Sequence, residues 1–158
     1  MMDGSGDGAM SKSTPATTAK QAAAAAFQPY EATTRGIRIR VEPKYMDDQS
    51  SPEDSHFVWS YAVEISNDGN ETVQLKSRMW RITDALGRTE EVRGAGVVGQ
   101  TPVIEPGKAF HYTSGCPLKT PQGIMVGSYQ MADEAGQLFD VAIPAFSLDS
   151  PYTRRSMN

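Results

Sequence analysis

Apolar and polar side chains alternate along most of the chain from about residue 30 to residue 147, and this two-residue period constrains the fold most strongly. In the segment TRGIRIRVEPKY, Ile37, Ile39 and Val41 alternate with Arg38 and Arg40. Successive side chains of a β-strand point to opposite faces of its sheet, so this pattern predicts a half-buried strand. No segment shows a convincing helical period, and the pattern therefore predicts an all-β fold.

The segment HFVWSYAVEIS repeats the alternation with larger side chains. Its apolar face would carry five residues: Phe57, Trp59, Tyr61, Val63 and Ile65. The later segment TVQLKSRMWRIT contains the second tryptophan, Trp80, also in an alternating context. We therefore expect Trp59 and Trp80 to be buried on two facing sheets.

Turn-forming sequences divide the chain into about seven to eight short strands. They are residues 67–70, Gly87, Pro106-Gly107 and residues 133–136, the last predicted to be a tight hairpin turn. Short strands with frequent turns are typical of a fibronectin type III/immunoglobulin-like antiparallel β-sandwich. The antibody-type Cys…Trp…Cys pattern is absent, which favours the fibronectin-like form. Pro144 should lie at an edge or a bulge, because proline cannot donate to a sheet ladder.

The N-terminal segment has a different composition. Residues 1–26 contain no Val, Ile, Leu or aromatic residue, so they can bury too little apolar surface to offset the entropy of ordering. We therefore expect a disordered leader over residues 1–29 and a β-sandwich domain over residues 30–154. The leader lacks the basic start and apolar segment of a secretory signal.

Charge and cysteine content narrow the function classes. The formal net charge is −4, whereas a protein that neutralises nucleic-acid phosphates usually carries surplus Lys and Arg. The single cysteine excludes an internal disulfide framework and fits a reducing compartment. No apolar run approaches the roughly 20 residues that span a bilayer. We expect a cytoplasmic protein that binds no nucleic acid and does not insert into a membrane.

The segment Arg93-Gly94-Ala95-Gly96-Val97-Val98-Gly99 matches the pattern G-x-G-x-x-G. In dinucleotide-binding folds this pattern opens a helix, but here QTPVIEPG follows, with two prolines and no helical period. Backbone N–H groups of a glycine-rich turn can still bind a small anion such as pyrophosphate or a nucleotide. Arg93, Gly94, Gly96 and Gly99 are the candidate residues. The alternative is that these glycines only permit bulges or positive φ angles.

Other candidate chemistry is sparse. Cys116 and His111 are close in sequence, but no spacing rule joins them as a nucleophile and base, and an inert thiol is favoured. His56 and His111 show no metal-ligand spacing with the acidic residues of 47–54, where a solvated loop is favoured over a weakly held Mg²⁺. We therefore expect no enzyme activity and no resident cofactor, with a weak divalent cation or pyrophosphate as the exceptions.

Longer stretches of the chain resemble a known family. VEPKYMDDQSSPE, FVWSYAVEISNDG and QLKSRMWRITDALGRTEEVRGAGVVGQTPVIEPGKAFHYTSG are similar to the bacterial ApaG family, also called CorD. TPQGIMVGSYQMADEAGQLFDVAIPAFSL is similar as well, so the resemblance covers about residues 30–154. It implies a fibronectin type III-like sandwich, a link to cobalt and magnesium resistance or efflux, and, through related eukaryotic domains of F-box and polymerase-interacting proteins, a role in protein interaction. The resemblance supplies no catalytic residues.

Three function classes follow from these observations. The first, which we favour, is a non-enzymatic module whose sheet face or edge engages a protein partner. The second is a small-anion binder that uses the loop from Gly94 to Gly99. The third, a hydrolase of phosphorylated metabolites, has no support in the sequence.

Overall fold

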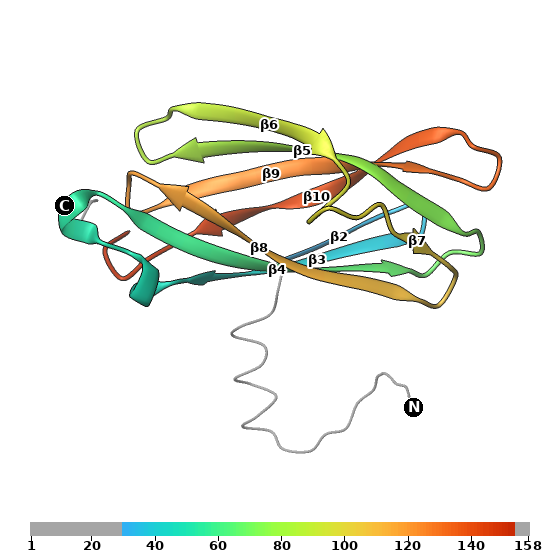
Figure 1. Ribbon diagram of the computed structural model, residues 1–158, viewed down its shortest axis with the longest axis horizontal. Coiled ribbons are helices and arrows are strands. Elements are labelled where there is room, and N and C mark those ends of the chain that lie inside the picture. The colour runs from blue at the N-terminus through green and yellow to red at the C-terminus, as the bar shows by residue number, and fades with distance from the viewer. Residues whose placement is uncertain (1–29, 154–158) are drawn as a thin grey trace, which may run out of the picture.

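Two antiparallel sheets pack face to face in the computed structural model, which describes residues 30–153 (Figure 1). One sheet has the order β2-β3-β4-β8, and the other has the order β10-β9-β5-β6 with β7 also paired to β5. The strands are β2 (Tyr30–Thr34), β3 (Ile37–Tyr45), β4 (Phe57–Asn67), β5 (Val73–Asp84), β6 (Thr89–Ala95), β7 (Val103–Ile104), β8 (Ala109–Leu118), β9 (Gly123–Ala132) and β10 (Leu138–Leu148). Two short 3₁₀ helices, η1 (Asp47–Gln49) and η2 (Pro52–Asp54), connect β3 to β4.

The predicted all-β sandwich is confirmed, and the described residues form nine strands where about seven to eight were expected. The two-residue strand β7 is too short to show a sequence period, and β2, with the sequence YEATT, has little apolar alternation. The predicted leader, residues 1–29, lies outside the described residues. In residues 30–153, no helix has the length and apolar character needed to cross a membrane.

The alternation of β3 and β4 places their apolar residues in the core, as predicted. Trp59 on one sheet and Trp80 on the other are 1% and 3% exposed. The ring centroids of Tyr61 and Trp80 are 5.3 Å apart, and those of Trp80 and Phe146 are 5.9 Å apart, both in edge arrangements. This geometry suits the quadrupoles of aromatic rings. The two sheets are therefore held together by aromatic contacts at the centre of the sandwich.

The predicted turns and the predicted position of Pro144 are also confirmed. The Gly136 N–H donates to the Asp133 carbonyl over 2.9 Å, which closes the turn between β9 and β10. Pro144 lies in the edge strand β10, where the register with β9 shifts between Ile143 and Phe146. The missing N–H is thus accommodated at an irregularity of an edge strand.

The two long sides of the sandwich differ. On one side β2 and β10 meet, and the Ala142 N–H donates to Thr34 Oγ1 over 3.3 Å. Arg35 strengthens this side, because its guanidinium lies 3.6 Å from Asp133 Oδ2 and 4.1 Å from the centre of the Phe139 ring. The other side is formed by the edge strands β6 and β8.

Replacing Trp80 with Ala should lower the free energy of unfolding by about 3–5 kcal/mol, because the change removes buried surface and leaves a cavity between the sheets. Urea unfolding followed by far-UV circular dichroism measures this loss. The exposed Leu86, 72% accessible at a turn, provides the control, and Leu86→Ala should change the stability by less than about 0.5 kcal/mol. A loss below about 1 kcal/mol for Trp80→Ala would contradict the packing described here.

Candidate binding site

The first glycine of the G-x-G-x-x-G segment makes room for an arginine. Gly94 lies in β6 opposite Arg78 of β5. A Cβ atom on Gly94 would lie 2.9 Å from Arg78 Nη1. The same Nη1 donates to the carbonyls of Ala95 and Gly96 over 3.0 and 2.8 Å. Gly94 therefore lets the guanidinium reach the backbone at the end of β6.

The second and third glycines shape a tight turn. Gly96 has φ +62°, and a Cβ there would lie only 2.2 Å from the Gln100 carbonyl oxygen. Val97 and Gln100 exchange two backbone hydrogen bonds of 2.8 Å each. The two residues between them, Val98 and Gly99, have φ +42° and +80°. Positive φ at both central positions is the mark of a type I′ turn, which is typical of two-residue hairpin loops.

This geometry bears directly on the predicted anion site. The Gly96 N–H donates to the Lys76 carbonyl over 2.9 Å, and the Val97 N–H donates to Gln100, so both donors are engaged within the protein. Arg93 and Gly94 line a hollow of about 460 Å³ together with Asp140, whereas Gly96 and Gly99 do not line it. Arg93 Nη2 also lies 3.2 Å from Glu91 Oε1. Only two of the four predicted residues line this hollow, and anion binding stays a prediction.

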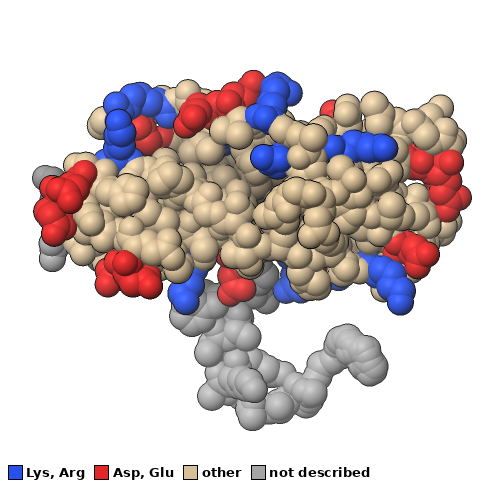
Figure 2. Space-filling view, in the orientation of Figure 1, with Lys and Arg blue, Asp and Glu red and all other residues tan. Residues whose placement is uncertain are grey.

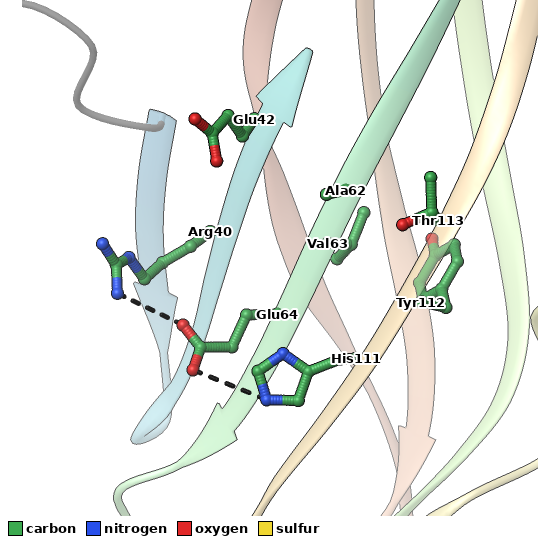
Figure 3. A pocket seen from close by; sticks show the side chains of 8 residues that line it. All are labelled: Arg40, Glu42, Ala62, Val63, Glu64, His111, Tyr112 and Thr113. Atoms are coloured by element: carbon green, nitrogen blue, oxygen red, sulfur yellow. Dashed lines mark hydrogen bonds and ion pairs between the residues drawn. The ribbon is translucent and has the colours of Figure 1, made fainter. Parts of the chain in front are cut away.

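A different hollow, of about 480 Å³, lies on the outer face of the sheet β2-β3-β4-β8 (Figure 3). The strand register produces it. One cross-strand row carries large polar side chains, in the order Glu31, Arg40, Glu64, His111. The adjacent row carries Glu42, Ala62 and Thr113. Because Ala62 and Thr113 are small, the sheet surface is hollowed beside the larger row.

Polar contacts connect the side chains of the larger row. Arg40 Nη1 donates to Glu64 Oε1 over 3.2 Å, and Arg40 Nε lies 3.6 Å from Glu31 Oε1. On the other side of Glu64, Oε2 lies 3.8 Å from His111 Nε2 (Figure 3). The His111 side chain is 68% exposed. The hollow thus presents positive and negative groups side by side to solvent, which suits recognition of a polar or charged side chain.

The buried side of β8 is fixed by a cross-sheet hydrogen bond. The hydroxyl of Tyr112 in β8 bonds to the hydroxyl of Tyr129 in β9. Burial raises the pKa of both phenols, so both stay protonated at neutral pH. This contact joins the two sheets directly beneath the strand that carries His111 and Thr113.

The structure does not bring together Cys116 and His111, the nucleophile and base considered from the sequence. His111 is exposed on the outer face, whereas Cys116 is 3% exposed in the core. Burial, assisted by the negative charge of Glu90, raises the pKa of the Cys116 thiol to about 11, which makes it a poor nucleophile at neutral pH. In residues 30–153, no group of three or more His, Cys, Asp or Glu side chains is placed to hold a metal ion.

Comparisons with known proteins converge on one family. Residues 47–133 match the model of the ApaG domain. The chain is 61% identical to protein ApaG of Paramagnetospirillum magneticum and 59% identical to protein ApaG of Brucella anthropi. Each alignment spans 129 residues, 82% of this chain and 99% of the relative. The crystal structure of the putative ApaA protein from Bordetella pertussis is 44% identical, with a TM-score of 0.71, over 78% of this chain and 98% of that one.

Two glycine substitutions distinguish the close packing around Gly96 from the cost of positive φ alone. Gly96→Ala and Gly99→Ala both place an alanine at positive φ, which costs about 1–2 kcal/mol each. Only the Gly96 variant also drives a Cβ into the Gln100 carbonyl, since nothing lies within 4 Å of a Cβ on Gly99. Urea unfolding should therefore show Gly96→Ala to be less stable than Gly99→Ala by about a further 1–3 kcal/mol. Equal losses would show that the turn is not packed as described.

Proposed function

The chain belongs to the ApaG family, and we propose that it acts as a non-enzymatic binding module that engages another protein. The observation that carries this proposal is the hollow on the outer face of β3, β4 and β8. Its polar row is linked across three paired strands by the Arg40–Glu64 ion pair and the contact between Glu64 and His111, so it needs less reordering than isolated side chains when a partner binds. Preorganised groups lose less entropy on association than flexible ones do.

The distribution of reactive groups supports a non-enzymatic role. A nucleophile needs a base within hydrogen-bond reach, and His111 and Cys116 lie on opposite faces of β8. Glu64, the carboxylate beside His111, is already engaged by Arg40. The hollow therefore resembles a docking surface more than a reaction centre.

The setting of this function is also part of the proposal. The resemblance to the family implies a link to cobalt and magnesium resistance or efflux. We place the module in that context, in the cytoplasm, through a protein partner that handles divalent cations rather than through a metal site of its own.

Small-anion binding by Arg93, Gly94, Gly96 and Gly99 is the competing proposal. It ranks second because an anion would have to displace the hydrogen bonds that Gly96 and Val97 already donate. Glu91 beside Arg93 would also repel a phosphate.

Affinity capture with the full chain as bait, followed by mass spectrometry, tests the proposed function. Ala62→Trp should fill the hollow, because Ala62 is exposed on the outer face and its side chain points away from the core. Ala142→Trp is the matched control, since Ala142 is an exposed alanine of β10 on the outer face of the other sheet. Both variants should keep the far-UV spectrum and melting temperature of the unmodified protein.

We expect a specific partner to be retained by the unmodified chain and by Ala142→Trp, and to be lost at least tenfold with Ala62→Trp. A tenfold loss corresponds to about 1.4 kcal/mol of binding free energy. If all three baits retain the partner equally, the hollow is not the binding site.

A further inference from the structure

The hydrogen bonds of β4 show which residues of β8 point their backbone N–H and C=O groups to the open edge of the sheet. The Val58 carbonyl in β4 accepts from the Met46 N–H on the β3 side, whereas the Asn67 N–H donates to the Lys108 carbonyl on the β8 side. Backbone groups alternate in direction along an antiparallel strand, so the odd-numbered residues of β4 bond to β8. Because these residues face even-numbered partners in β8, the odd-numbered residues of β8 point to the open edge.

Those outward residues are Ala109, His111, Thr113, Gly115 and Pro117. Pro117 agrees with this assignment, since a proline in a sheet is placed with its missing N–H toward an open edge. Within residues 30–153, β8 pairs with β4 alone, and no backbone hydrogen bond outside that ladder uses these outward groups. A row of donors and acceptors is therefore available along one side of β8.

The free edge of β8 carries no charged protection. Its sequence, AFHYTSGCPL, contains no Asp, Glu, Lys or Arg. Charged residues are one of the devices by which natural edge strands oppose pairing with another chain. The edge strand of the other sheet, β6, has Glu90, Glu91 and Arg93. Figure 2 shows the contrast, with charges along the rim over β6 and a broad uncharged area across the middle, where β8 runs in Figure 1.

We propose that β8 is a self-association edge at which two copies of this chain pair antiparallel. His111 would lie opposite Thr113 of the second copy and Ala109 opposite Gly115, with the two-fold axis beside Tyr112. Pro117 then stays outside the paired segment, and each outward N–H between residues 109 and 115 gains an acceptor. The proposal goes beyond the proposed function, because it concerns the assembly of the module and not its partner.

The surfaces beside the edge favour a second copy as the occupant. In this register the row Arg40, Glu64, His111 of one copy continues into the row Thr113, Ala62, Glu42 of the second copy. The large His111 side chain is thus placed beside the hollow over Ala62, in both directions by symmetry. With a net charge of −4, two copies approach each other best at a strand without fixed like charges.

Sedimentation velocity of the full chain tests this proposal over a concentration range that brackets Kd values of about 1 μM to about 1 mM. Thr113→Pro removes an outward N–H without breaking a bond to β4. It should raise the dimer Kd at least tenfold.

Thr89→Pro is the matched control. The Asp84 N–H donates to the Arg88 carbonyl, and the Gly96 N–H donates to the Lys76 carbonyl. The even-numbered residues of β6 therefore bond to β5. The N–H of Thr89, an odd-numbered residue, faces an open edge. This variant should dimerise as the unmodified chain does.

Amide hydrogen exchange on the unmodified chain tests the same edge without a substitution, so it gives an answer even if Thr113→Pro fails to fold. In the dimer, the amides of Ala109, His111, Thr113 and Gly115 should become protected as the concentration rises. A monomer at every concentration would overturn the proposal, as would a dimer unaffected by Thr113→Pro or one that protects other segments instead. None of these results decides the partner-binding function, which is tested separately by affinity capture with Ala62→Trp.

Discussion

The ring contacts among Tyr61, Trp80 and Phe146 are the interaction on which the other features depend. They lie between the two sheets and determine which face of β4, β5 and β10 is buried. Because side chains alternate along a strand, burying Tyr61 necessarily exposes its neighbour Ala62 on the outer face. The same alternation places Glu64 outside. The hollow and its charged row are thus a consequence of how the core is packed.

The pairing of the strands then places side by side residues that lie far apart in the sequence. The register between β3, β4 and β8 aligns Arg40, Glu64 and His111 across three strands. It also decides that the outward backbone groups of β8 belong to odd-numbered residues. A one-residue slip would reverse both results, since it exchanges the inner and outer faces. The proposed binding at this sheet therefore depends on the register as much as on the residues present.

The sequence was sufficient for the fold class, the burial of Trp59 and Trp80, the turn at residues 133–136 and the irregularity at Pro144. Each of these follows from a local pattern or from the chemistry of one residue. The row from Arg40 to His111 was missed, because its members are far apart in the chain and only long-range pairing brings them together. For the same reason, the pattern G-x-G-x-x-G did not reveal that Gly94 makes room for Arg78.

The central claim is that this member of the ApaG family recognises its partner through the outer face of β3, β4 and β8. Amide chemical-shift mapping of the isotope-labelled full chain against the purified partner tests it most directly. The largest shifts are expected on Arg40, Ala62, Glu64, His111 and Thr113. Shifts confined to the outer face of the sheet β10-β9-β5-β6 would contradict it.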